Sequence, residues 1–206
     1  MKLHKYRLCI DFINTLSWRG REVPAEGLIK YSDLIAWSRQ VGITTPQDAN
    51  KLLKKADRHP ADGKKVWYGA VDLRETIYRI LTAIIDNQKP VKKDLTAFNN
   101  YLSKTMTLSR IINTKNGFSW DASGDKSKMD WVLNPVIRSA ADLLVSDELQ
   151  KLKSCSDPMC GWLFLDISRN QSRRWCDMKD CGNRAKAKRF YQKKQIKKKI
   201  YAGKHK

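Results

Sequence analysis

Four cysteines in the C-terminal part of the chain are the residues best suited to chemistry. Cys155 and Cys160 are five positions apart, Cys176 and Cys181 repeat that spacing, and fifteen residues separate the two pairs. Each pair can hold a metal ion from one tight turn, and the intervening segment is long enough to bring the pairs together. Four thiolates form a closed, tetrahedral zinc site. The spacing therefore predicts one structural Zn²⁺ per chain and no catalytic metal.

The residues around the cysteines predict the shape of this module. Residues 162–165 form an apolar run of strand length, residues 166–172 are polar and turn-like, and residues 173–175 lead back to the second cysteine pair. The Ala, Lys and Arg residues that begin at Arg184 favour a helix. We therefore expect a knuckle (a tight turn that carries two cysteines), a hairpin, a second knuckle and a basic helix.

Two disulfide bonds are the alternative role for these cysteines. The first residues, MKLHKYRLCIDF, carry charges but no apolar run long enough for a secretion signal. A chain of 206 residues also does not need disulfides in order to fold. We therefore expect reduced cysteines in a cytoplasmic protein. A zinc ion that only holds the fold together remains an open alternative to a zinc-dependent binding module.

Several strings of residues resemble a known family. CGNR at residues 181–184 resembles the signature of the bacterial CGNR zinc-finger family, and residues 160–191 resemble its whole finger. Members join the finger to an N-terminal domain called ABATE. LCIDFINTL at residues 8–16 resembles the L-D-F-V-N-T motif that opens this domain, and LRE at residues 73–75 resembles its L-R-E motif. The resemblance implies a zinc-dependent, DNA-binding transcription regulator.

Positive charge is concentrated in the same C-terminal part. The chain holds 41 Lys/Arg and 21 Asp/Glu, of which residues 151–206 hold 17 and 4, and from Arg184 to the end there are 11 Lys/Arg and no acid. Such charge beside a zinc module favours binding to phosphate backbones. A solvated tail is the alternative. A membrane partner is not expected, because the segment lacks a wide apolar face and the chain lacks a transmembrane-length apolar run.

The candidate nucleic-acid contacts lie in the polar turn and at the start of the basic helix. Arg and Asn can read base edges, whereas Lys mostly contacts phosphates. The candidates are Arg169, Asn170, Arg173, Arg174, Asn183, Arg184, Lys186, Lys188 and Arg189. Among them, Arg173, Arg184 and Lys188 are the predicted phosphate contacts. Asn183 and Arg184 could instead hydrogen-bond to a cysteine sulfur or cap the helix.

Duplex DNA, bound at the nucleoid, is the predicted partner, and RNA binding and catalysis are the competing function classes. Aromatic residues of the finger could stack on RNA bases, although packing around the zinc site explains them more simply. The only histidines before the finger are His4 and His59, and the chain has no phosphate loop or nucleophile elbow. We therefore predict that the protein is not an enzyme.

The predicted fold is mainly α, with a helical domain at residues 1–148 and the zinc module at residues 149–206. The predicted helices are 8–16, 33–41, 46–57, 64–86, 91–103, 127–133 and 134–145, together with a hairpin at 106–122 that turns at Asn116-Gly117. A strand is the alternative for residues 8–16, and residues 17–31 are expected to form a loop. Thr45 and Asn134 are the predicted caps of the helices at 46–57 and 134–145, and an apolar stripe at i, i+3, i+4 spacing runs along the helix at 64–86. Residues 193–206 are expected to fray. The helical domain is expected either to sense a ligand or to form a homodimer, which would suit two-fold symmetric DNA sites.

Polar residues within apolar elements are the candidate ligand site of the helical domain. Asp11, Asn14 and Thr15 interrupt the apolar stretch at residues 8–16, and Arg74 lies in the middle of the longest predicted helix. Buried polar groups need partners, so these residues either bond to neighbouring backbone or bind a small-molecule effector. Arg74 could pair with Asp11 in the interior, form a surface ion pair, or bind an anionic ligand.

Overall fold

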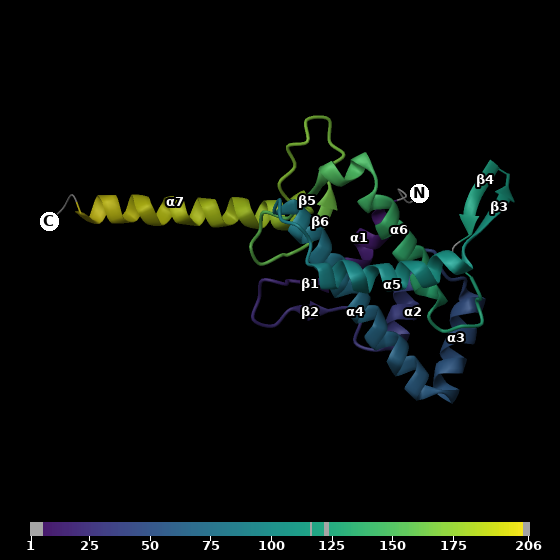
Figure 1. Ribbon diagram of the computed structural model, residues 1–206. Helices are drawn as coiled ribbons and strands as arrows, with labels where there is room; N and C mark the ends of the chain where they lie inside the picture. The colour runs from purple at the N-terminus through teal and green to yellow at the C-terminus, as the bar shows by residue number, and fades with distance from the viewer. Residues whose placement is uncertain (1–5, 116, 122–123, 204–206) are drawn as a thin grey trace.

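The computed structural model describes residues 6–115, 117–121 and 124–203, with side chains up to residue 195 (Figure 1). The α-helices in these residues are α1 (Arg7–Ile13), α2 (Tyr31–Gln40), α3 (Pro46–Arg58), α4 (Pro60–Ile85), α5 (Lys92–Leu108), α6 (Asn134–Leu144) and α7 (Asn183–Gly203). The short helical turns are η1 (Trp131–Leu133), η2 (Asp147–Lys151) and η3 (Met178–Gly182). The chain is mainly α, as the sequence predicts.

Three antiparallel strand pairs accompany the helices in the described residues. They are β1 (Leu16–Ser17) with β2 (Ala25–Glu26), β3 (Arg110–Thr114) with β4 (Gly117–Asp121), and β5 (Leu152–Ser154) with β6 (Leu163–Leu165). The β3–β4 pair is the predicted hairpin, which projects from the helical body (Figure 1). Asn116 of its predicted turn lies outside the described residues.

The N-terminal helices enclose one apolar core. The short helix α1 lies against α4 and α6, and α2 packs on α3 and α4. Phe12 and Ile13 of α1, Leu73 and Leu81 of α4, and Leu143 of α6 have no exposed surface. The apolar stripe predicted for the longest helix therefore faces the core. No helix in the described ranges is both long and apolar enough to span a bilayer.

Several predicted boundaries are wrong for local reasons. Helix α4 begins at Pro60 rather than residue 64, because proline suits the first turn of a helix and only His59 separates α3 from α4. Helix α5 continues to Leu108, five residues beyond its predicted end, so the hairpin begins only at Arg110. The predicted cap of α3 is confirmed, since Thr45 Oγ1 accepts a hydrogen bond of 3.1 Å from the Asp48 amide.

Two other predicted helices are shorter than expected. The first ends at Ile13, and Leu16, predicted to be helical, lies in β1. Thr15 helps to end that helix, because its amide and its hydroxyl both donate to the Phe12 carbonyl. The helix predicted at 127–133 is reduced to the turn η1, and Asn134 is the first residue of α6 rather than its cap.

The finger contains the predicted strand, but with a different partner. Residues 163–165 form β6 and pair with β5, in the register Leu152 to Leu165 and Ser154 to Leu163, whereas residues 173–175 form no strand. The first knuckle is therefore the loop of the β5–β6 hairpin. Residues 193–203, expected to fray, continue α7, which extends away from the rest of the molecule (Figure 1).

Candidate functional site

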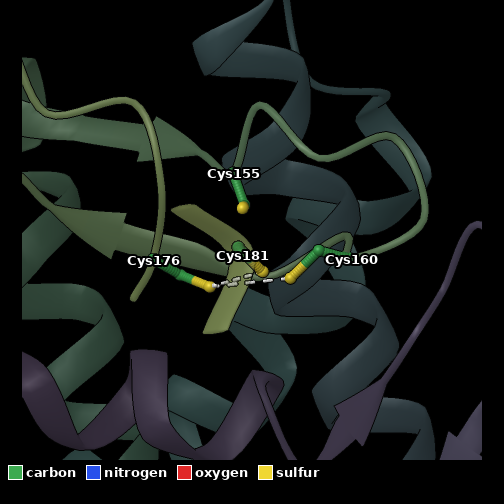
Figure 2. Close-up of side chains that lie close together, drawn as sticks. All are labelled: Cys155, Cys160, Cys176 and Cys181. Atoms are coloured by element: carbon green, nitrogen blue, oxygen red, sulfur yellow. Dashed lines mark hydrogen bonds between the residues drawn. The ribbon is translucent and has the colours of Figure 1, made fainter. Parts of the chain in front are cut away.

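The four cysteine sulfurs converge on one point (Figure 2). The Sγ atoms of Cys155, Cys160, Cys176 and Cys181 all lie within 4.8 Å of one another. The sulfur of Cys176 is 3.6 Å from that of Cys160 and 3.7 Å from that of Cys181. In a tetrahedron with Zn–S bonds of about 2.3 Å, the sulfurs are about 3.8 Å apart. The cluster therefore has the size and the ligand type for one zinc ion.

Local turns position the first knuckle. The amide of Cys155 donates to the Trp162 carbonyl at 2.9 Å, and the amide of Cys160 donates to the Asp157 carbonyl at 2.9 Å. Gly161 follows with a φ of 71°, a conformation that glycine adopts without strain. A side chain at this position would also collide with Arg19, whose Cβ lies 2.5 Å from the place of an added Cβ.

The second knuckle ends in the single π-helical turn η3, which contains Cys181. The carboxylate of Asp177 caps this turn, because its Oδ1 accepts hydrogen bonds from the amides of Lys179 and Asp180. The following residues continue directly into α7. The first turn of α7 is therefore fixed to the zinc cluster.

Clustering and burial raise the pKa of three of the thiols. The hydrogen bond to Cys155, together with burial, raises the pKa of Cys160 to about 12. The pKa of Cys176 is raised chiefly by its hydrogen bond to Cys155, and that of Cys181 chiefly by burial. A bound cation reverses this balance, since thiols that ligate zinc are deprotonated. Four thiolates would complete the coordination of zinc, so the ion would be structural.

Arg184 links the two knuckles around the cluster. Its Nη2 donates to the Cys181 sulfur at 3.2 Å, its Nε donates to Asp157 of the first knuckle at 2.9 Å, and its Nη1 lies 3.1 Å from Asp180. The guanidinium carbon lies 4.3 Å from the centre of the Trp18 ring. These contacts match the alternative predicted for Arg184, a hydrogen bond to a ligating sulfur, rather than a phosphate contact.

Arg173 and Asn183 are likewise engaged within the finger. Arg173 donates through Nε to the Trp175 carbonyl at 2.8 Å and through Nη2 to the Cys176 carbonyl. Asn183 donates through Nδ2 to the Lys179 carbonyl at 2.9 Å. Both side chains therefore support the second knuckle, although Arg173 was a predicted phosphate contact.

Asp166 holds the polar turn in place from the interior. It has no exposed surface and accepts hydrogen bonds from the amides of Ser168 and Arg173 and from the Lys153 ammonium. Burial alone would raise the pKa of this carboxyl, but the hydrogen bonds from Lys153 and Ser168 outweigh it and hold the pKa well below its usual range. The role of Asp166 was not predictable from the sequence, because a single aspartate after a strand resembles any turn residue.

The remaining nucleic-acid candidates are exposed. They occupy the polar turn and the first turns of α7, and they are Arg169, Asn170, Arg174, Lys186, Lys188 and Arg189. Among them, Arg189 donates to the Ala185 carbonyl of its own helix at 3.3 Å. The exposed candidates thus form two groups that flank the second knuckle.

The predicted ligand residues of the helical domain do not form one site. Arg74 is only 1% exposed, and its Nη1 and Nη2 donate to both carboxylate oxygens of Glu26 at 2.6 Å. It also donates to Glu75 at 2.9 Å and to Thr15 at 3.2 Å. The predictions of a pair with Asp11 and of a surface ion pair were both wrong. The β1–β2 pair brings Glu26 to the buried arginine, a contact that no local pattern indicates.

Asp11 and Asn14 lie on a different side, facing the finger. Asp11 pairs with Arg7 of the same helix at 3.4 Å. Asn14 accepts a hydrogen bond from the Leu163 amide at 3.0 Å and donates to the Leu163 carbonyl at 2.9 Å. Its amide group thus pairs with β6 as another strand would, and it ties the end of α1 to the finger.

Arg19 completes the contact between the two parts of the chain. Its amide donates to the Cys160 carbonyl at 3.3 Å, and its guanidinium donates to Glu75 at 2.7 and 3.1 Å. The same guanidinium stacks on Tyr78, whose hydroxyl donates to the Gly161 carbonyl at 2.9 Å. Residues 17–31 were predicted only as a loop, and through Arg19 this loop joins the first knuckle to the buried ion pairs.

Comparison with known families identifies both parts. Residues 6–147 match ABATE, described as "Putative stress-induced transcription regulator", and residues 151–194 match the CGNR zinc finger. Among curated proteins, none matches this chain. Both matches confirm the architecture that the sequence motifs imply, and the ABATE match covers more than half of the chain. The chain therefore belongs to the ABATE family and carries a CGNR zinc finger after its ABATE domain.

Proposed function

We propose that the protein is a zinc-dependent transcription regulator whose finger and α7 bind duplex DNA at the nucleoid. The main support is the position of α7. The helix starts directly at the zinc cluster, and from Arg184 onward the chain has 11 Lys/Arg and no acid. The family descriptions support a zinc-binding regulator and do not point to an enzyme.

The proposed contacts divide the basic residues into two roles. Arg173, Asn183 and Arg184 hold the finger together, so they position the surface and do not touch DNA. The exposed side chains of the polar turn and of α7 would contact the DNA, and they are Arg169, Asn170, Arg174, Lys186, Lys188 and Arg189. An α-helix about 10–12 Å across fits a major groove about 12 Å wide. Helix α7 would enter this groove with its N-terminal end fixed by zinc.

A double charge reversal tests this proposal. We expect Lys188→Glu with Arg189→Glu to lower the affinity for a 20-base-pair duplex at least tenfold and to reduce the slope of log K against log salt by about 2, since each phosphate contact contributes about 0.9. The zinc content should stay at one ion per chain. Affinity would be measured by fluorescence anisotropy across a salt series.

The matched control reverses the same charge elsewhere. Lys51 and Lys54 are exposed on α3, which belongs to the helical domain. Lys51→Glu with Lys54→Glu should leave DNA affinity within about twofold of wild type. Equal losses in both double variants would mean that only net charge matters, and unchanged affinity in the α7 variant would contradict docking through this helix.

RNA is the second candidate partner, favoured by one observation. Phe190 and Tyr191 are 65% and 66% exposed, whereas Trp162 and Trp175 pack against the cysteine cluster. Packing around the zinc site, the simpler explanation for the aromatic residues of the finger, therefore accounts for Trp162 and Trp175 but not for the pair on α7. Exposed aromatic rings can stack on unpaired bases. Competition between duplex DNA and RNA of equal length would identify the preferred partner.

The helical domain, residues 1–148 in this proposal, would sense an effector or form a homodimer. Its contacts with the finger through Asn14 and Arg19 give it a route by which to alter the finger, residues 149–206. Sedimentation of the full chain at several concentrations would establish whether the ABATE domain dimerises.

A further inference from the structure

A cavity of about 440 Å³ opens between α4, α5 and residues 128–137, and Lys55 of α3 also lines it. This volume falls in the range of small-molecule sites. None of the residues predicted to bind a ligand lines this cavity. Arg74, Thr15 and Asn14 instead bond to other parts of the protein. The cavity also lies apart from the cysteine cluster, so no role in the finger accounts for it.

The lining combines an apolar surface with an excess of positive charge. Val66, Leu133 and Ile137 contribute apolar side chains. The charged residues of the lining are Lys55, Lys65, Lys104, Lys128, Asp62 and Asp130. Within the described part of the chain, none of the four lysines forms a salt bridge. The ammonium group of Lys55 donates a hydrogen bond of 2.7 Å to the Ser127 carbonyl. The cavity therefore offers a net charge of two positive units beside an apolar wall.

Gly69 keeps this cavity open from the middle of α4. Glycine inside a helix is less stable than alanine, and an added Cβ here would meet only the Tyr101 hydroxyl, at 4.0 Å. The protein's own packing therefore does not require glycine at this position. A larger residue would instead place its side chain in the cavity. A glycine that leaves such a space beside a helix is expected where a ligand occupies the cavity.

Tyr101 adds a polar group that stays protonated. Its hydroxyl lies 3.3 Å from the Gly69 carbonyl and 3.2 Å from Asp72 Oδ2, and it can donate its one proton to either acceptor. Burial, together with the nearby Asp72, raises the pKa of Tyr101 to about 12. At neutral pH the tyrosine therefore adds no negative charge that would oppose an anion among the lysines.

We propose that this cavity binds an amphipathic organic anion, with an apolar or aromatic body against the wall and an anionic head among the lysines. Lysine ammonium groups suit carboxylate, sulfonate and phosphate heads alike, because they act as compact point charges. The ligand would be the effector of the regulator. Only this last step rests on the proposed function, since binding itself is independent of DNA.

The probe for the test is 8-anilinonaphthalene-1-sulfonate, whose aromatic body and sulfonate match the lining and whose fluorescence rises on binding. Titration of the full chain without DNA should show saturable binding that decanoate displaces and decanol does not. Gly69→Leu should weaken binding at least tenfold by filling the cavity. Gly69→Ala should raise the melting temperature while weakening binding severalfold, which a purely structural glycine would not do.

Charge variants separate this cavity from other surfaces. Lys65→Glu with Lys104→Glu should weaken binding at least tenfold, whereas Lys51→Glu with Lys54→Glu on α3, outside the cavity, should bind as wild type does. The α7 variant Lys188→Glu with Arg189→Glu should also bind the dye normally, even though it loses DNA. Unchanged binding in folded Gly69→Leu, or equal losses in both pairs of charge variants on the helical domain, would overturn the proposal.

Discussion

At the scale of single residues, the buried ion pairs around Arg74 account for the L-R-E motif. Burial would raise the pKa of Glu26 and of Glu75, but hydrogen bonds from Arg74 to Glu26 and from Arg19 to Glu75 outweigh it, and both pKa values are lowered. A carboxylate with a lowered pKa stabilises the fold above its unfolded pKa, about 4.3 for glutamate, and loses that contribution as the pH falls through its folded value. These pairs therefore stabilise the domain at neutral pH and not in acid.

Arg74→Ala should destabilise the protein by roughly 3 kcal/mol, because it leaves two carboxylates partly buried without their cation. Urea unfolding at pH 7 would measure this loss. Arg79→Ala on the same helix is the matched control. The Arg79 side chain is 50% exposed in its pair with Asp94, so its loss should cost only about 1 kcal/mol. Equal costs would contradict a structural role specific to Arg74.

The same pairs predict a pH dependence. Wild type should lose stability as the pH falls below about 4.3, the unfolded pKa of glutamate, because Glu26 and Glu75 have lowered pKa values in the folded protein. Glu26→Gln should lose less stability over the same fall in pH, because one of the titrating groups is gone. Urea unfolding of both proteins at each pH, in zinc-free buffer with chelator, separates this effect from loss of the metal. Parallel curves for the two proteins would contradict the assignment.

At the scale of elements, α7 is a helix stabilised at only one end. Arg184 and the zinc cluster fix its first turn, but Arg184 and Lys188, and Arg189 and Lys193, place like charges four residues apart. Such pairs repel and weaken a helix in water. The phosphates of DNA, or added salt, would relieve the repulsion.

We therefore expect the helical signal of the full chain at 222 nm to rise on adding duplex DNA, and to rise by a smaller amount on adding salt alone. Circular dichroism, with the spectrum of free DNA subtracted, measures both changes. A variant cut after residue 186 provides the control, since it keeps Asn183 and Arg184, which hold the finger together, but lacks almost all of α7 and should show neither rise. The same rise in the shortened chain would assign the change to another element.

At the scale of the whole molecule, the finger is interlocked with the helical domain rather than suspended from a linker. Asn14 bonds to β6, Arg19 to the first knuckle and Tyr78 to Gly161. Loss of zinc should therefore destabilise the helical domain as well as the finger. Metal sites that form only in the folded state contribute their binding free energy to folding.

Removal of zinc by a chelator, or Cys176→Ser, should lower the melting temperature of the entire chain and increase hydrogen exchange in α1. In Asn14→Ala, which removes two hydrogen bonds between the parts, α1 should exchange faster even with zinc bound. Hydrogen exchange read by mass spectrometry measures both effects. Protection of α1 that does not change on chelation would show that the two parts are independent.

The sequence predicted the features that depend on local spacing. The convergence of the four cysteines, the apolar stripe of α4 and the strand at 163–165 follow from spacing and periodicity, which short segments carry by themselves. Glu26 as the partner of Arg74, β5 as the partner of β6 and the cavity beside Gly69 were not predictable. Each depends on how distant segments pack, and that packing leaves no periodic signal in one sequence.

The bond between Asn14 and Leu163 also affects how the chain folds during synthesis. The first helix finds its partners late, because Asn14 pairs with a strand 149 residues further on, and the Cys9 amide donates to the Ser139 hydroxyl 130 residues away. A ribosome adds about 5–20 residues per second, so these partners are synthesised about 7–30 seconds after α1. These two hydrogen bonds of α1 therefore cannot form until the chain has been synthesised through α6 and β6. The bonds that fix the first helix are thus completed by β6, a segment made after all the other helices of the ABATE domain.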